Sequence, residues 1–301
     1  MSTAITFSEY GPPEVLRPTE VTPLEPGPGQ VRIRVRAASV NPFDIKLRSG
    51  RMAKVAPAHF PVAPGLDAAG VVDAVGEGAD AAVGDEVLGA TVGGSYGEYA
   101  LLERPVAKPD ALSWEVAASL VTVGQTAFRV LGQLGVQAGQ ALLVHGAAGS
   151  VGVIAVQLAV ARGITVIGTV GETDIERVSA LGATAVRYGD GWVERVKAAA
   201  PGGVDFVFDA SGAGVLADSV ALTGDAGKVI TIADMSAQQH GVSFSAGSAD
   251  QGGLSLPELV QLAAAGKLTL PIWRTYPLAE AAQAHADLEA HRNRGKAVLL
   301  P

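Results

Sequence analysis

The chain has 301 residues, of which 48% are hydrophobic and 17% charged, so it can bury a full-sized core and form one large or two modest domains. Its net charge of −8, with no run of Lys or Arg, disfavours nucleic acid and anionic membranes as partners. Cysteine is absent, which excludes disulfides, thiolate nucleophiles and cysteine-based metal sites and fits a reducing compartment. Because no basic segment followed by an apolar one opens the chain, we expect no signal peptide and a cytoplasmic location.

Short strands and loops are predicted for residues 1–110. The segment 30–40, QVRIRVRAASV, alternates Val31, Ile33 and Val35 with arginines, as a strand with one buried face does. Further short apolar runs are bounded by Gly and Asp, and prolines break the rest. This pattern predicts a small, irregular β-barrel.

From Ser113 onwards, apolar strands alternate with helices, which predicts βαβ units and a parallel sheet covered on both faces. Thr173 and Glu176 have capping-box spacing, and Gly182 stands where that helix would end. The expected strands are 141–145, 164–169, 184–188, 204–210 and 227–233. The other expected helices are 150–162, 192–200 and 215–222.

The rest of the chain is predicted to contain two more helices and further strands. Ser255 and Glu258 have capping-box spacing at the start of a helix over 255–266. After the segment KLTLPIWRTYPL, a helix over 279–290 and a strand over 295–301 end the chain.

The apolar stretch 142–160 is about as long as a membrane helix, but glycines interrupt it at regular spacing. It lies where a predicted strand meets a helix, and there Ala147-x-Gly149-x-x-Gly152 is the dinucleotide-binding fingerprint with alanine in the first position. Small residues allow a tight turn, a close approach of the backbone to a pyrophosphate, and close packing of the helix on the strand. The helix N-terminus would present N–H groups and a positive dipole to the anion. The stretch is therefore predicted to be a nucleotide-binding turn, and His145 before it a core residue.

The end of the second strand of the parallel sheet distinguishes NAD from NADP, because NAD enzymes place an acid there to bind the ribose 2′-hydroxyl. Here Thr169, Val170 and Gly171 occupy this end, which favours NADPH. Glu172 and Asp174 favour NADH instead if their loop folds inward. The side chains that could face a 2′-phosphate are Arg177, Arg187 and Tyr188, although Arg177 could equally be a solvated helix residue.

Several motifs together resemble those of a known family. They include AASVNPFDIKLRSG, FPVAPGLDAAGVVDAVGEGA, GSYGEYAL, VHGAAGSVG, VDFVFDASG and RGKAVLLP. In order and spacing they are similar to the zinc-independent branch of the medium-chain dehydrogenase/reductase superfamily, the zeta-crystallin-like quinone and enone oxidoreductases. The resemblance implies an α/β protein with a GroES-like irregular β-barrel domain over 1–121, completed by 268–301, and a Rossmann domain with a doubly wound parallel sheet over 122–267.

The resemblance also implies which residues contact the cofactor. The glycine turn would bind the pyrophosphate, Thr126 would lie near the nicotinamide, and Tyr188 would pack near the adenosine ribose phosphate. With the residues of the fingerprint and the strand end, the full set of expected contacts is Thr126, Ala147, Gly149, Ser150, Val151, Gly152, Thr169, Gly171, Arg177, Tyr188, Ser211, Ile232 and Ala233. No metal site is expected, because the zinc branch binds its metal through Cys and His, and the five histidines show no ligand spacing.

The substrate end is expected in the segment NPFDIK, where Asn41 and Asp44 match the family's polar residues beside the nicotinamide. Many quinone reductases carry a tyrosine where this chain has Lys46, and alkenal and enone reductases often carry lysine. Tyr96 is a further candidate for the cleft. Two simpler interpretations stay open: Asn41 as a loop residue that bonds the backbone, and Lys46 as a solvated surface residue.

The implied function is an NADPH-dependent, metal-independent reductase that transfers hydride to a quinone or to the activated C=C bond of an α,β-unsaturated carbonyl. Lys46 or Asn41 would stabilise the carbonyl oxygen as it becomes negative, and Lys46, Tyr96 or water would return the proton. The alternatives are a trans-enoyl thioester reductase and a non-catalytic NADPH-binding protein. The family also implies a homodimer through the edge strands of the Rossmann sheets, here the segments 227–233 and 241–247.

Overall fold

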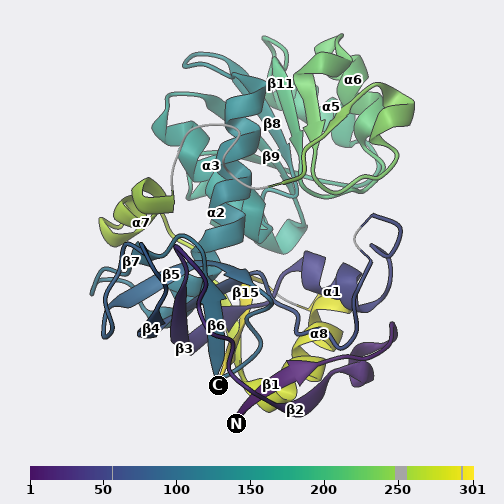
Figure 1. The fold of residues 1–301 in the computed structure, drawn as a ribbon. Coiled ribbons are helices and arrows are strands. Elements are labelled where there is room, and N and C mark those ends of the chain that lie inside the picture. Colours follow the sequence, from purple (N-terminus) through teal and green to yellow (C-terminus); the bar gives the residue numbers. More distant parts are fainter. Residues whose placement is uncertain (56, 248–255, 293) are drawn as a thin grey trace. The chain divides into compact units, whose positions relative to one another are not determined.

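The computed structural model describes residues 1–55, 57–247, 256–292 and 294–301. The chain divides into two compact units, one formed by Met1–Thr122 with Leu256–Pro301 and the other by Val123–Ser255 (Figure 1). Helix α2 (Trp114–Leu134) runs through the boundary between them. None of the helices in the described part of the chain is both long and apolar enough to cross a membrane.

The first unit is built on an irregular β-barrel, as predicted. Its main sheet has the order β14-β15-β3-β4-β5-β6, with β7 beside β5, and β3 also pairs with β6, which closes the sheet on itself. The strands are β3 (Val31–Ser39), β4 (Asp67–Val75), β5 (Glu86–Val92), β6 (Tyr99–Leu102), β7 (Val106–Ala107), β14 (Ile272–Pro277) and β15 (Lys296–Leu300). Strands from both ends of the sequence thus share one sheet, because β15 pairs antiparallel with β3.

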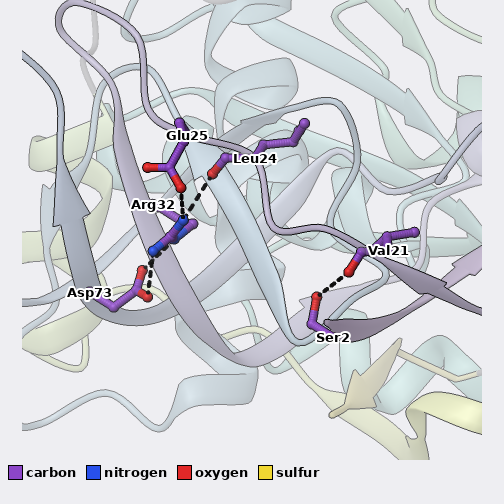
Figure 2. A network of polar contacts seen from close by, with 6 residues as sticks. All are labelled: Ser2, Val21, Leu24, Glu25, Arg32 and Asp73. Atoms are coloured by element: carbon purple, nitrogen blue, oxygen red, sulfur yellow. Dashed lines mark hydrogen bonds and ion pairs between the residues drawn. The ribbon is translucent and has the colours of Figure 1, made fainter.

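Smaller elements complete the first unit. The strands β1 (Ser2–Thr6) and β2 (Arg17–Val21) form an antiparallel pair, in which the hydroxyl of Ser2 donates to the carbonyl of Val21 (Figure 2). Its short helices are α1 (Pro42–Arg48), α7 (Leu256–Ala264) and α8 (Ala281–Glu289). Helix α7 contacts β7 and groups with this unit, whereas the predicted division placed it in the Rossmann domain.

Strand β3 shows the predicted alternation: Val31, Ile33 and Val35 are buried, and the arginines between them are more exposed. One of these, Arg32, reaches across to Asp73 on β4 through two hydrogen bonds of 3.0 and 3.2 Å (Figure 2). The same guanidinium also donates to Glu25 at 3.0 Å, so the segment before β3 is fastened to the outside of the barrel.

The second unit is a parallel sheet with the strand order β10-β9-β8-β11-β12-β13. Numbered from β8 this is 3-2-1-4-5-6, the order of dinucleotide-binding folds, in which the connection changes direction between β8 and β11. The strands are β8 (Ala141–His145), β9 (Thr165–Val170), β10 (Thr184–Arg187), β11 (Phe206–Asp209), β12 (Val229–Thr231) and β13 (Ser243–Phe244). The helices between them are α3 (Ser150–Ala161), α4 (Ile175–Ser179), α5 (Trp192–Ala199) and α6 (Leu216–Thr223).

Both faces of this sheet are covered. One face contributes Leu143, Ile167 and Val207 to a core cluster with Val196 of α5 and Leu216 of α6. Neighbouring strand residues point to the opposite face, where α3 packs on β8 and β9. Sequence had predicted this doubly wound arrangement, and the position of each strand agrees to within a few residues.

One predicted helix start is wrong. A capping box of Thr173 and Glu176 was expected, but α4 begins at Ile175 after the 3₁₀ turn Glu172–Asp174, and Asp174 is the N-cap without a side-chain capping bond. The carboxylate of Asp174 accepts hydrogen bonds from Arg177 instead. Gly182 has a φ of 93°, which fits its expected place after the helix. The second predicted box depends on Ser255, which lies outside the described residues.

Candidate cofactor and substrate sites

The glycine turn between β8 and α3 is as tight as the fingerprint requires. Gly146 has a φ of 72°, in the left-handed region, and Gly149 is the N-cap of α3. A Cβ added to Gly152 would lie 2.2 Å from the carbonyl oxygen of Gly146, so only glycine allows the helix to approach the turn this closely. The free N–H groups of the first turn, at Ser150 and Val151, therefore stand beside the backbone where a pyrophosphate would bind.

Ala147 takes the first position of the fingerprint and faces inward. It is fully buried, and a Cβ on Gly168 of β9 would lie 2.7 Å from its methyl group. Its N–H donates to the carbonyl of Thr169 at 3.2 Å. The turn is thus packed against β9, and Ala147 supports the turn through this contact.

Asp209 organises the ends of β11 and β12. Its Oδ1 accepts from the N–H and the hydroxyl of Ser211 at 2.9 and 2.7 Å, and its Oδ2 accepts from the hydroxyl of Thr231 at 2.8 Å. A Cβ on Gly146 would lie 3.4 Å from Cβ of Ser211, and one on Gly212 would lie 3.0 Å from Ala233. The turns after β8, β11 and β12 therefore touch one another at the carboxyl edge of the sheet.

The expected contacts differ in how accessible they are. Ser211 is exposed and Ile232 and Ala233 are half-buried at this edge, while Thr126 lies half-buried on α2. Thr169 is only 3% exposed, and its hydroxyl bonds Nδ1 of His145 at 3.0 Å beneath the surface.

His145 is a core residue, as predicted. Its Nε2 bonds the hydroxyl of Ser219 at 3.1 Å, and its ring packs edge-on against Trp192. Burial lowers the pKa of His145 to about 4, against the opposing charge of Asp209, so the imidazole is neutral at physiological pH.

Two ion pairs lie at the end of the second strand. Arg177 donates to Asp174 at 2.9 Å and to the carbonyl of Ala148 in the glycine turn, also at 2.9 Å. Arg187 pairs with Glu172 at 3.3 Å. Arg177 and Arg187, which were expected to face a 2′-phosphate, are thus paired with Asp174 and Glu172. These are the two acids that would favour NADH.

Tyr188 follows Arg187 and is 62% exposed. Its N–H donates to the carbonyl of Val170, and its hydroxyl would lie 3.5 Å from a Cβ on Gly171. The ring is therefore an open aromatic surface beside Gly171, the residue that follows β9.

In the first unit, Asn41 is part of a buried polar cluster. Its side-chain amide donates to Asp67 at 3.0 Å, and its Oδ1 accepts from Nζ of Lys296 at 2.7 Å. Asp67 also accepts from the hydroxyl of Ser39 at 2.7 Å, and Asn41 is only 2% exposed. The geometry supports the interpretation of Asn41 as a residue that holds its loop.

Asp44 and Tyr96 are fully enclosed beside this cluster. Asp44 accepts from the N–H of Asn41 at 2.8 Å and from the hydroxyl of Tyr96 at 3.2 Å. Because that hydroxyl has one proton, it accepts the hydrogen bond from Nε2 of His285, 3.0 Å away. Burial raises the pKa of Asp44 to about 7, while the bond from Asn41 opposes the shift. The side chains of Asn41, Asp44 and Tyr96 are all buried, so a direct role in the cleft has no support from their positions.

Lys46 differs from the other three candidates. It lies on α1 and is half-buried, and no hydrogen bond or ion pair joins its ammonium to another described residue. Partial burial and the nearby charge of Arg51 lower its pKa. It is the candidate whose charged group is left available for a substrate oxygen.

Sequence reasoning missed Asp67, Asp209, His285 and Lys296, although all of them except His285 carry a signal in the sequence. Asp67 and Asp209 interrupt apolar runs, in GLDAAG and FVFDAS. A carboxylate buried in such a run is tolerated only when hydrogen-bond donors satisfy it. Lys296 is the first residue of β15 and is followed directly by the apolar residues of that strand. Asp209 bonds the nearby Ser211, but Asp67, His285 and Lys296 bond residues that are distant in sequence, so the runs alone could not identify them.

Comparison with known proteins gives the context for this geometry. Residues 27–110 match the family model described as alcohol dehydrogenase GroES-like domain, and residues 181–299 match the one described as zinc-binding dehydrogenase. A quinone oxidoreductase of Pseudomonas aeruginosa is 33% identical over 330 residues and is covered, like this chain, to 100%. The chain belongs to the zinc-independent quinone oxidoreductase branch of the medium-chain dehydrogenase/reductase superfamily.

Solved structures of relatives share the fold of this branch. The quinone oxidoreductase of Escherichia coli, solved with NADPH, has a TM-score of 0.86 and 28% identity over 99% of this chain and 100% of that one. A mycobacterial protein complexed with NADPH has a TM-score of 0.87 and 30% identity over 100% of both chains. Despite the zinc-binding description of one model, the chain has no cysteine, and the described residues include no group of three or more His, Asp or Glu that could hold a metal ion.

Gly152→Ala tests the tight turn. The added methyl group must displace the carbonyl of Gly146 or the helix, so we expect about 3 kcal/mol lower stability and a loss of NADPH binding. Urea unfolding and a nucleotide titration measure both. Gly202→Ala is the control, because its Cβ would meet nothing within 4 Å. Unchanged NADPH binding by Gly152→Ala would show that the turn has room to spare.

The buried carboxyl of Asp44 predicts a pH dependence. Its folded pKa, about 7, exceeds the ordinary 3.8, so its contribution to stability is complete below pH 3.8 and is lost as the pH rises through 7. Asp44→Asn removes this titration, and the free energy of unfolding of the variant should rise relative to wild type by on the order of 4 kcal/mol between pH 4 and 7. Urea unfolding across this range measures the difference, with the exposed Asp110→Asn as control. A constant difference would mean that Asp44 is ionised throughout.

Proposed function

We propose that this protein is an NADPH-dependent quinone reductase that also reduces α,β-unsaturated carbonyl compounds. The observation that carries the proposal is the glycine turn, where the close approach of Gly152 to Gly146 presents the first turn of α3 as an anion cradle. Similarity over nearly the whole chain to the quinone oxidoreductases of Pseudomonas aeruginosa and Escherichia coli supports the same function. The Escherichia coli protein was solved with NADPH.

The residues of the second unit fit NADPH. The N–H groups at the start of α3 would hold the pyrophosphate, and Ser211 with Ala233 would border the same edge of the sheet. Bound NADPH supplies a hydride, which reduces the quinone or the β-carbon of the enone. Asp209 acts by fixing the turn at Ser211, because its carboxylate accepts both the N–H and the hydroxyl of that residue.

Lys46 is proposed to act on the substrate. Its ammonium would donate to the carbonyl oxygen, which gains negative charge during reduction, and its lowered pKa makes the proton easier to release. Asn41, Asp44 and Tyr96 would keep α1 in place through the buried contacts described above. Since an enone depends on carbonyl polarisation more than a quinone does, Lys46 favours enone reduction as a second activity.

The test is oxidation of NADPH and NADH, followed at the absorbance band of the reduced nicotinamide, with a quinone panel and an enone panel. We expect turnover of both panels with NADPH. Lys46→Met should lower kcat for enones by about 100-fold and change it little for quinones, by analogy with removal of an oxyanion donor. Lys54→Met removes an exposed lysine of the following loop and is the control.

Other outcomes favour other functions. NADPH binding without turnover of either panel would favour a non-catalytic binding protein, and turnover restricted to enoyl thioesters would favour the trans-enoyl reductase. An equal loss on both panels by Lys46→Met would contradict its role at the enone carbonyl.

We further propose a homodimer in a reducing, cytoplasmic compartment. The two-residue strand β13 is the outer strand of the parallel sheet, and Phe244 on it is 40% exposed. Pairing of β13 with its copy would cover this edge. Phe244→Glu should therefore give a monomer in sedimentation experiments, and Phe60→Glu, which alters an equally exposed ring of the first unit, is the control. A wild-type monomer would contradict the proposal.

A further inference from the structure

Two arginines lie near the end of β9, Arg177 on α4 and Arg187 at the end of β10, and they have different surroundings. The guanidinium of Arg177 bonds Asp174 through Nε at 3.2 Å and Nη2 at 2.9 Å, and Nη2 also donates to the carbonyl of Ala148. These bonds join α4 to the glycine turn. Arg177 is therefore already used in holding the turn that would bind the pyrophosphate.

Among the residues that the structure describes, Arg187 bonds one other side chain. Nη1 pairs with Glu172 at 3.3 Å, and both side chains are well exposed, 56% and 75%. Exposed pairs of this kind contribute little to stability and exchange readily with water. The guanidinium of Arg187 is thus held loosely and can turn to another anion.

The backbone that carries Arg187 is, by contrast, fixed. Arg195 on α5 donates to the carbonyls of Arg187 and Asp190, both at 2.9 Å, and to that of Gly189 at 3.1 Å. The same segment presents the exposed ring of Tyr188 beside Gly171. A loosely paired cation at the end of β10 and an open aromatic ring directly after it therefore lie on a fixed backbone beside the end of β9, which in this fold faces the adenosine ribose.

We propose that Arg187 binds the 2′-phosphate of NADPH, that Glu172 limits this preference, and that Arg177 is a positioning residue for the pyrophosphate turn. The assignment rests on the proposed use of NADPH. A 2′-phosphate carries close to two negative charges, so it competes with Glu172 for Arg187 and is repelled by the same carboxylate. Arg177 cannot serve equally well, because it would have to leave both Asp174 and Ala148.

The roles predict different effects on the two nucleotides. Glu172→Gln frees Arg187 and removes the repulsion, so the Kd for NADPH should fall about 5-fold while that for NADH stays constant. Arg187→Gln should raise the Kd for NADPH about 10-fold and leave NADH unchanged. Arg177→Gln should raise both values by a similar factor, because the pyrophosphate is common to both nucleotides.

The experiment is equilibrium titration of the full chain with NADPH and with NADH, read by calorimetry. Arg187→Lys should keep most of the NADPH preference, because a phosphate accepts a point charge, whereas Arg177→Lys should not restore the wild-type affinities, because one ammonium cannot reproduce the three bonds of the guanidinium. Glu194→Gln and Lys197→Gln remove exposed charges from α5 and are the controls.

The outcomes separate this assignment from the proposed function. If wild type binds both nucleotides and the NADPH to NADH ratio is unchanged by Glu172→Gln and Arg187→Gln, the assignment is overturned and the proposed function stands. A selective loss of NADPH in Arg177→Gln would overturn it as well. If wild type binds neither nucleotide, the proposed function fails and takes the assignment with it.

Discussion

The carbonyl oxygen of Gly146 occupies the place where a side chain on residue 152 would have to be. Everything at the carboxyl edge of the parallel sheet depends on this approach. It lets α3 start directly above β8, and it leaves room for the turn at Ser211 to touch the turn at Gly146. A second close contact, between Ala147 and Gly168, fixes the same turn on β9. Glycine at these positions loses more conformational entropy on folding than other residues do. In exchange, the backbone forms a surface whose N–H groups are already directed at an anion.

The first unit achieves rigidity by different means. Its centre holds groups that burial alone would expel, namely Lys296, Asp44 and Asp67, and they are tolerated because each is hydrogen-bonded: Lys296 to Val40 and Asn41, Asp67 to Ser39 and Asn41, and Asp44 through one oxygen to Asn41 and Tyr96. Such a cluster is a weak source of net stability, since desolvation offsets much of the attraction. It does define one arrangement of α1 relative to the barrel, because any shift would leave a buried charge without its partner. This arrangement sets where Lys46 lies on the next turn of α1.

Sequence predicted the elements better than the site. Hydrophobic periodicity is a local property, so the alternation in β3 and the strand-helix sequence from β8 to β12 could be recognised from the residues alone. The glycine spacing between β8 and α3 was equally local. The boundaries of α4 were not, because Asp174 turns toward Arg177 and a 3₁₀ turn replaces the expected cap. The roles of Asn41, Asp44 and Tyr96 depend on distant residues: Lys296 is 255 residues from Asn41, and His285 is 189 residues from Tyr96. No pattern in the sequence around Asn41, Asp44 or Tyr96 could show that contacts with these distant residues would bury them.

The barrel also constrains the order in which the protein can be made. Strand β3 emerges from the ribosome long before its pairing partner β15, which contains residues Lys296–Leu300. Until β15 has emerged, Ala38 and Ser39 have no strand on that side and Asn41 lacks the ammonium of Lys296. The parallel sheet, whose strands follow one another in sequence, can form before the barrel is complete. The nascent protein therefore carries an open β-edge at Ala38 and Ser39 while the strands of the parallel sheet are made, and pairing with β15 covers this edge.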